Sequence, residues 1–207
     1  MYALIQIEKL GQTSKMPCPS YSLSARDCKT GSRLRKINGS VCHGCYAYTG
    51  RYNCKTVTAS HARNLASINI DGWADRMVAA IRKKKNPHFR WHDSGDLQNM
   101  RHLYQIVEIA QRLPGVQFWL PTKELSIVGN YLKERGRFPD NLTVRVSAFM
   151  IDGPRPSLPL PCSTVRSHGA PVPAGAVACS APTTNNQCGD CRACWSASVA
   201  EVSYEKH

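Results

Sequence analysis

The sequence predicts an α/β fold built on a parallel sheet. Two observations predict it: the middle of the chain alternates between helical and strand-like patterns, and all ten cysteines lie outside that middle, five up to Cys54 and five from Cys162 onward. Alternating helices and strands favour right-handed crossovers and therefore parallel pairing. A complete eightfold barrel needs about 250 residues. A chain of 207 residues therefore suits a partial, open barrel or a small doubly wound sheet.

Three helices and three strands are expected in the middle of the chain, in the order α-β-α-β-α-β. Residues 72–85 place apolar side chains at helical spacing and end in a basic run, which suits a helix C-terminus. Residues 99–112 carry a broader apolar helical face. Ser126 is expected to cap a third helix, which ends near Gly136. The strands are expected at 88–92, 116–120 and 142–149.

A proline-rich stretch follows these elements. Residues 153–175 contain six of the thirteen prolines, which argues against a regular helix or a central strand. We therefore expect a long ordered loop that leads to the second group of cysteines. The whole chain is read as a single domain, with a cysteine-rich segment 1–60, a β/α core 61–150, and a loop and cysteine cluster 151–207.

The composition excludes several classes of protein. A hydrophobic fraction of 42% can bury a core, which excludes disordered chains and disulfide-stapled miniproteins. No window approaches the roughly 18 apolar residues of a membrane span, and the apolar run between Met1 and Leu10 is too short for a signal peptide. We therefore expect a cytoplasmic protein, in which clustered thiols bind metal rather than pair as disulfides.

The carboxy-terminal cysteines have the spacing of metal ligands. Cys188-x2-Cys191-x2-Cys194 offers three thiolates to one compact inorganic core, and Cys179 is a natural fourth ligand. Zinc sites usually pair two separate Cys-x2-Cys hairpins, whereas a tight triple run is similar to the ferredoxin pattern. The run departs from that pattern at Trp195, where a nearby Cys-Pro is absent. We expect a [4Fe–4S] cluster, with Zn²⁺ as the alternative.

The amino-terminal pair Cys42-x2-Cys45 is a weaker signal, because the same spacing also occurs in dithiol redox pairs. We expect both residues to be metal ligands. Cys18 or Cys28 can complete a second site, or the pair can join the carboxy-terminal ligands if the chain ends meet. The four remaining cysteines fit burial as small hydrophobes as well as ligation. They are Cys18, Cys28, Cys54 and Cys162.

Polar side chains follow the predicted strands at their carboxyl ends, where ligands and catalytic groups gather in parallel α/β folds. The candidate catalytic residues are His92, Asp93, Ser94, Asp96 and Lys123, and the candidate cofactor-binding residues are Thr122 and Ser147. A common alternative for the two aspartates is to cap the following helix, and for the histidine to satisfy a backbone group.

Four sequence segments together resemble a known family. They are Cys42-x2-Cys45-Tyr46-Ala47, Phe89-Arg90-Trp91-His92-Asp93-Ser94-Gly95-Asp96-Leu97, Phe118-Trp119-Leu120-Pro121-Thr122-Lys123, and Cys179 followed by Cys188-x2-Cys191-x2-Cys194-Trp195. They look like the phage- and plasmid-encoded "gene product eighty-eight" family. The likeness runs from about residue 40 to 195 and, if the gene is phage-borne, implies location in the host cytoplasm.

The family's cysteine pattern and α/β alternation are in turn similar to radical S-adenosylmethionine enzymes, which hold a [4Fe–4S] cluster at the mouth of a partial barrel. The chain departs from those enzymes because it lacks Cys-x3-Cys-x2-Cys, and Ser94-Gly95-Asp96 stands where those enzymes would have a glycine-rich cofactor turn. The likeness therefore carries over the cluster and the barrel-like architecture rather than S-adenosylmethionine binding.

The basic charge points to a partner. There are 27 Lys and Arg against 14 Asp and Glu, for a net charge of +13, with one basic patch at Arg33, Arg35 and Lys36 and another from Arg82 to Lys85. Such patches attract the phosphates of nucleic acid in a salt-dependent way, although charge runs are also common on solvated faces without a partner.

These observations together predict a partial, open parallel β/α barrel whose cysteine-rich ends close a metal cluster site. The predicted function is a phage-type iron–sulfur protein of radical-SAM-like fold, a redox or radical enzyme acting on nucleic acid. The alternative is a non-catalytic module, stabilised by zinc or an iron–sulfur cluster, that binds nucleic acid or protein.

Overall fold

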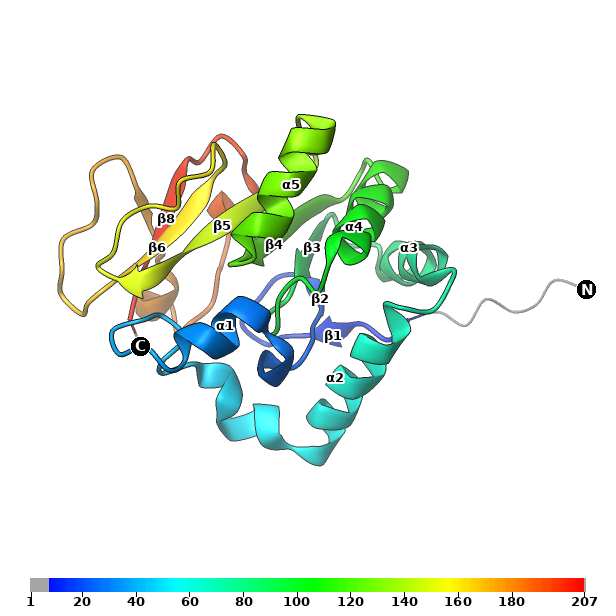
Figure 1. The fold of residues 1–207 in the computed structure, drawn as a ribbon, viewed down its shortest axis with the longest axis horizontal. Helices are drawn as coiled ribbons and strands as arrows, with labels where there is room; N and C mark the ends of the chain where they lie inside the picture. Colours follow the sequence, from blue (N-terminus) through cyan, green and yellow to red (C-terminus); the bar gives the residue numbers. More distant parts are fainter. Residues whose placement is uncertain (1–7, 207) are drawn as a thin grey trace, which may run out of the picture.

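An eight-stranded, mostly parallel sheet organises the chain in a computed structural model that describes residues 8–206 (Figure 1). The strands are β1 (Gly11–Gln12), β2 (Pro19–Tyr21), β3 (His88–Trp91), β4 (Gln117–Thr122), β5 (Leu142–Ile151), β6 (Cys162–Arg166), β7 (Val177–Ala178) and β8 (Glu201–Glu205). Their order in the sheet is β1-β2-β3-β4-β5-β6-β8-β7, and only the β1–β2 pair is antiparallel among the described strands.

The helices are short and lie mainly in the first two thirds of the chain. They are α1 (Lys29–Leu34), α2 (Lys55–Ser67), α3 (Trp73–Lys84), α4 (Met100–Arg112) and α5 (Leu125–Arg135). Single 3-10 turns are η1 (Ala25–Asp27), η2 (Tyr46–Tyr48), η3 (Gly50–Asn53), η4 (Ala181–Thr183) and η5 (Ala193–Trp195). Within residues 8–206, none of the helices has the length and apolarity needed to span a membrane.

From β2 to β6 each parallel strand joins the sheet beside the strand that precedes it in the chain. Right-handed crossovers then place successive helices on one side of the sheet, and α3, α4 and α5 lie together on one side (Figure 1). This order differs from a doubly wound sheet, in which the strand order reverses. The sheet ends at two edge strands and is not closed. The expected α/β parallel architecture is confirmed, whereas a barrel is not.

The side of the sheet that faces these helices is apolar. Phe89 and Trp91 of β3, Leu120 of β4 and Val144 of β5 are buried there. They pack with Ile106 and the other apolar side chains of α3, α4 and α5 that the helical periodicity predicts. This side therefore contains the main hydrophobic core.

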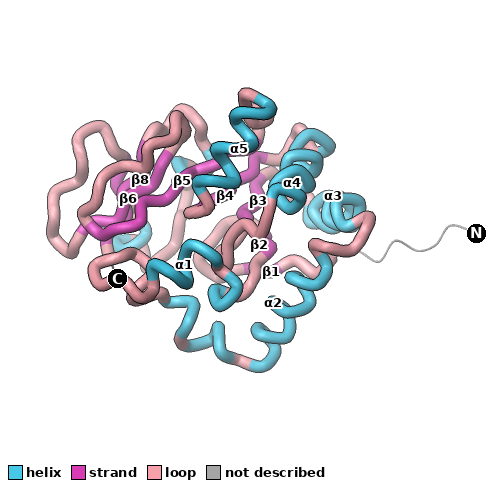
Figure 2. The backbone as a smooth tube through the Cα atoms, in the orientation of Figure 1, coloured by secondary structure: helices cyan, strands magenta, loops and turns pink. Residues whose placement is uncertain are grey.

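The opposite side of the sheet is polar. Adjacent positions on the four strands β2 to β5 carry Ser20, Arg90, Trp119 and Thr143, which share one face because paired positions point the same way. The chain between η4 and β8 is loop apart from the single turn η5 (Figure 2), and it packs on this face through Trp195. Trp195 packs on Trp119 there, with ring centroids 5.1 Å apart, and its indole N–H donates to the carbonyl of Phe89 at 2.9 Å.

A buried arginine ties this loop to the sheet. Arg145 of β5 is fully buried and donates hydrogen bonds to four main-chain carbonyls. The four acceptors belong to Cys162, Ala193, Ser196 and Val199, at 2.9, 3.1, 3.0 and 3.1 Å. On this side of the sheet the loop is therefore held by hydrogen bonds to a guanidinium, whereas the helices on the other side are held by apolar packing.

The three expected helices and three expected strands are confirmed, each within about two residues of its predicted ends. Two expectations are wrong. Ser126 is not the cap of α5, because the helix begins at Leu125 and Glu124 occupies the cap position. The stretch 153–175 is not loop throughout, because it contains β6, which lies inside the sheet between β5 and β8. The prolines flank these five residues and leave their backbone donors free.

We predict that replacing Arg145 by Leu lowers the free energy of unfolding by roughly 3 kcal/mol or more, since each carbonyl left buried without a donor costs about 1–3 kcal/mol. Urea unfolding followed by tryptophan fluorescence measures the change. The control is Arg51→Leu, an exposed position whose side chain has no hydrogen bond or ion pair within residues 8–206. The control is expected to stay within about 0.5 kcal/mol of the wild type. An equal, small loss in both variants would contradict the anchoring role.

Candidate metal centre and the neighbouring sheet edge

Eight of the ten cysteines fall into two groups in space. We call Cys18, Cys179, Cys188, Cys191 and Cys194 the carboxy-terminal thiol group. We call Cys28, Cys42 and Cys45 the amino-terminal thiol group. Burial raises the pKa of Cys18, Cys188, Cys194, Cys28 and Cys42, and a neighbouring thiol of the same group adds to each rise. All ten cysteines are free thiols.

The carboxy-terminal thiol group lies on the polar face of the sheet. Cys18 directly precedes β2, and the amide of Cys188 donates to the carbonyl of Lys15 at 3.2 Å. The amide of Cys179 donates to the carbonyl of Ser203 in β8 at 2.9 Å. The sulfur of Cys194 lies 3.0 Å from the hydroxyl oxygen of Tyr204. Cys18, which the sequence left unassigned, thus lies near cysteines that are about 170 residues away in the chain.

Three arginines surround this group. Burial raises the pKa of Cys18 to about 12, and Arg90 and Arg192 oppose that rise. Burial raises the pKa of Cys194 to about 11, where Arg145 and Arg90 act in the same opposing sense. Without a metal the thiols of Cys18 and Cys194 are therefore protonated at neutral pH. With a metal bound, the guanidinium groups would compensate the negative charge of the thiolates.

The segment that supplies four of these thiols has little packing of its own. None of residues 179–194 is buried, and their only regular structure is the two turns η4 and η5. The apolar anchor comes only after them, at Trp195. Hydrogen bonds rather than a hydrophobic core therefore hold this segment, among them those from the amides of Cys179 and Cys188 and from Arg145 to Ala193. A metal bound by its four thiols would add a further constraint.

The amino-terminal thiol group lies at the carboxyl edge of the sheet. Glu124, at the end of β4, accepts hydrogen bonds from the amide and the hydroxyl of Thr30 at 2.8 and 2.9 Å, which holds α1 and the adjacent Cys28 at this edge. The amide of Val41 donates to the carbonyl of Phe149 in β5 at 2.8 Å, which places Cys42 beside it. Cys28 is therefore the third thiol of this group.

Gly31 leaves room between two of these sulfurs. A Cβ atom on Gly31 would lie 3.6 Å from the sulfur of Cys28, 3.7 Å from that of Cys42, and only 2.9 Å from the Cβ of Cys28. The last distance is shorter than real Cβ contacts allow. Any larger residue at position 31 would therefore displace the side chain of Cys28.

The side chains do not form a finished metal site. Across residues 8–206, no three His, Cys, Asp or Glu side chains converge closely enough to hold one ion. Two cysteines lie outside both groups: Cys54 is exposed at the start of α2, and Cys162 is buried in β6. The metal ligation expected for Cys42, Cys45, Cys179, Cys188, Cys191 and Cys194 stays a prediction.

Three of the predicted pocket residues meet beside the amino-terminal thiol group. Asp96 is buried and accepts hydrogen bonds from the hydroxyl of Thr122 at 2.6 Å and from the amide of Lys123 at 2.8 Å. Burial raises the pKa of Asp96 to about 6 against the opposing effect of these bonds. Burial raises the pKa of the Cys28 and Cys42 thiols, and the charge of Lys123 opposes that rise. Asp96 does not cap α4, whose cap is Asn99.

Three other predicted residues have separate partners. Asp93 accepts hydrogen bonds from the hydroxyls of Ser20 and Tyr52, both at 3.2 Å. Ser94 is buried, and its hydroxyl donates to the carbonyl of Leu23 at 2.5 Å. Ser147 lies on the polar face of β5, where it accepts a hydrogen bond from Ser163 at 3.1 Å.

His92 turns away from this edge. Its φ of +54° reverses the strand alternation, and its ring packs near Trp91 and near His102 of α4, 5.4 Å from the latter between centroids. Neither ring nitrogen has a hydrogen-bond partner within the described chain. Burial, His102 and Arg90 lower the pKa of His92 well below its usual range. The imidazole is therefore neutral and enclosed on the core side.

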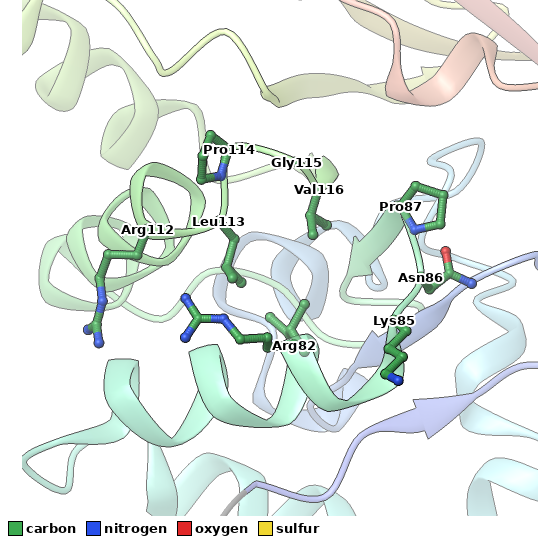
Figure 3. Close-up of a pocket in the computed structure, with 10 residues that line it drawn as sticks. Arg82, Lys85, Asn86, Pro87, Arg112, Leu113, Pro114, Gly115 and Val116 are labelled. Atoms are coloured by element: carbon green, nitrogen blue, oxygen red, sulfur yellow. The ribbon is translucent and has the colours of Figure 1, made fainter.

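The second basic patch lies at the amino edge of the sheet. A hollow of about 460 Å³ is lined by Arg82 and Lys85 at the end of α3 and by Arg112 at the end of α4 (Figure 3). Arg112 also forms ion pairs with Asp75 and Glu108, at 2.7 and 2.9 Å. Asp75 and Glu108 thus offset part of the positive charge of this patch. The patch lies at the opposite end of the strands from the amino-terminal thiol group.

Sequence reasoning missed the arginines around the thiols. The alternation of apolar and polar residues from Leu142 to Ser147 indicates that β5 has a polar face and places Arg145 on it, but it gives no sign that Arg145 is buried. No comparable signal joins Cys18 to the carboxy-terminal thiols, because their contact depends on the assembled sheet.

Comparison with known proteins gives one match. The family model described as "Gene product 88" matches residues 3–197. Searches of curated proteins and of solved structures found no match to the chain. The likeness to radical S-adenosylmethionine enzymes is not supported by these comparisons.

We predict that His102 destabilises the fold in acid. Burial lowers its pKa from 6.5 to about 3, so the unfolded chain binds the proton first as the pH falls below 6.5. Stability is therefore lost between pH 6.5 and 3, about 3 kcal/mol of it by pH 4.

Urea unfolding at pH 7 and pH 4 tests this for the wild type and His102→Gln, whose amide oxygen can still accept the hydrogen bond from the amide of Gln98. The wild type is expected to lose about 3 kcal/mol more than the variant on acidification. Parallel losses would show that His102 is not buried in the neutral form.

Proposed function

The chain belongs to the gene product 88 family, and we propose that it is an iron–sulfur protein with a redox function. The carboxy-terminal thiol group is the proposed [4Fe–4S] site. The observation that carries the proposal is that five free thiols, from both ends of the chain, meet on one polar face of the sheet among three arginines.

The donor set fits such a cluster. Cysteine thiolates are the usual ligands of [4Fe–4S] cores, and four of them around the core carry a charge of about −2. Arg90, Arg145 and Arg192 are placed to balance that charge. The exposed segment 179–194 can close around the core as ligation and local folding proceed together.

When bound, a cluster supplies one-electron redox chemistry. The neighbouring residues of the chain tune that chemistry. The hydroxyl of Tyr204, 3.0 Å from the sulfur of Cys194, can donate a hydrogen bond to the thiolate. Hydrogen bonds and positive charge near the sulfurs stabilise the more negative, reduced form of a cluster. Trp119 and Trp195 cover the sheet beside the site and limit the access of water.

The amino-terminal thiol group is the proposed second site. Cys28, Cys42 and Cys45 offer three thiolates, so one corner of a four-iron core would need a ligand other than cysteine. The site lies at the carboxyl edge of an open sheet with consecutive strand order. This arrangement supports a partial-barrel, radical-SAM-like interpretation. Asp96, Thr122 and Lys123 stand beside the site as the residues available to position a substrate.

Metal analysis after anaerobic purification tests the proposal. About four irons and four sulfides per chain, broad absorption near ~400 nm and bleaching by dithionite are expected for one cluster, and eight of each for two. Zinc without iron would contradict the redox proposal. It would favour the alternative of a zinc-stabilised binding module instead.

We predict that Cys191→Ala removes about four irons per chain, because one missing thiolate opens the carboxy-terminal cluster. Cys54→Ala is the matched control, since Cys54 is exposed and lies outside both thiol groups. Iron and sulfide analysis of both variants decides the outcome. Full iron content in Cys191→Ala would remove this residue from the ligand set.

We also predict that Gly31→Ala lowers the iron content of the amino-terminal site alone, because the added Cβ would displace the side chain of Cys28. Gly44→Ala is the matched control: Gly44 lies between Cys42 and Cys45, and a Cβ there meets nothing within 4 Å. The expected result is a loss of up to four irons in the first variant and none in the second. Equal iron content in both would contradict a site at Cys28 and Cys42.

A further inference from the structure

The acidic residues of the chain are unevenly distributed. Residues 28–70 contain no Asp or Glu, and they contain seven Lys and Arg, so this segment accounts for +7 of the net charge of +13. The seven are Lys29, Arg33, Arg35, Lys36, Arg51, Lys55 and Arg63. We call residues 28–70 the acid-free segment. It forms α1, η2, η3 and α2.

The cations of the acid-free segment are available to a partner. All seven side chains are exposed, and none of them forms an ion pair with a described residue. Lys36, Arg51 and Lys55 also lack side-chain hydrogen bonds within residues 8–206. In Figure 1 α1, η2, η3 and α2 run along the lower border of the molecule, and the segment ends beside α3. The positive charge is therefore concentrated on one border of the molecule.

Aromatic rings stand among these cations. Tyr46 is 56% exposed, although its hydroxyl donates a hydrogen bond to the carbonyl of Asp93 at 2.5 Å. Its ring lies 5.6 Å from that of Tyr52. Tyr48 is covered by guanidinium groups, with Arg35 4.1 Å and Arg26 5.2 Å from the ring centroid. A fixed, exposed ring on a segment that also carries unpaired cations suits the bases and phosphates of one strand.

We propose that the acid-free segment binds single-stranded nucleic acid, with Tyr46 stacking on a base and Lys36, Arg51 and Lys55 contacting phosphates. A flexible single strand can present an unpaired base to the ring, whereas the bases of a duplex are stacked on one another. The inference goes beyond the iron–sulfur proposal and does not depend on it, because it rests on charge and on an aromatic ring.

Fluorescence anisotropy with labelled oligothymidine and oligouridine 20-mers tests the proposal on the anaerobically purified full chain. The triple variant Lys36→Gln, Arg51→Gln, Lys55→Gln is expected to bind roughly tenfold to 100-fold more weakly at 0.1 M salt. The slope of log K against log salt should become shallower by about 2, since each lost phosphate contact contributes about 0.7. The charge-matched control is Arg82→Gln, Lys83→Gln, Lys84→Gln in α3, which is expected to bind within about twofold of the wild type.

Two substitutions of Tyr46 test the stacking. Tyr46→Ala is expected to weaken binding at least about fivefold, whereas Tyr46→Phe retains the ring and is expected to bind as the wild type does. Equal losses in the acid-free-segment triple variant and the α3 control would overturn the proposed surface. Equal affinity for a duplex of the same length, or no effect of Tyr46→Ala, would overturn single-strand binding. Iron content measured on the same preparations separates a failure here from a failure of the iron–sulfur proposal.

Discussion

The buried guanidinium of Arg145 holds the polar side of this molecule together. It sits inside a sheet whose opposite face is packed by three helices, and its hydrogen bonds end on carbonyls of β6, of η5 and of the chain just after η5. That chain follows directly on the carboxy-terminal thiols. A buried charge without acceptors costs far more than one with them. The sheet and the cysteine segment therefore depend on each other.

The two faces of the sheet have different origins. Apolar residues at helical and strand periods form the helix-covered face, and they need no ligand to do so. The other face has a small apolar cluster, in which Trp119 and Trp195 are the largest members. Outside this cluster the loop is held to this face by hydrogen bonds, and the carboxy-terminal thiols lie among them. This division separates the part of the fold that is stable by packing from the part whose order is proposed to come with metal.

Sequence periodicity predicted the helices and strands of the helix-covered side, because the apolar residues that each of them buries recur at the helical or strand period. It failed at β6, where the five residues Cys162–Arg166 are too short to show a pattern among flanking prolines. It also misplaced His92, because a positive φ at that residue moves its ring from the sheet edge to the core. Asp96, Thr122 and Lys123 were brought together as expected, since adjacent parallel strands end at one edge. The proximity of Cys18 to Cys188 could not be predicted, because it arises only when the sheet is assembled.

The charge of the acid-free segment is compatible with a cluster inside it. Three thiolates around a [4Fe–4S] core of charge +2 carry a net charge of about −1. Against the +7 of the segment, this leaves about +6 at the carboxyl edge of the sheet. Loading the amino-terminal site would therefore remove little of the attraction for a polyanion. A bound strand would then lie beside the thiols and Lys123, so the two proposed activities can share one border of the molecule without competing for the same side chains.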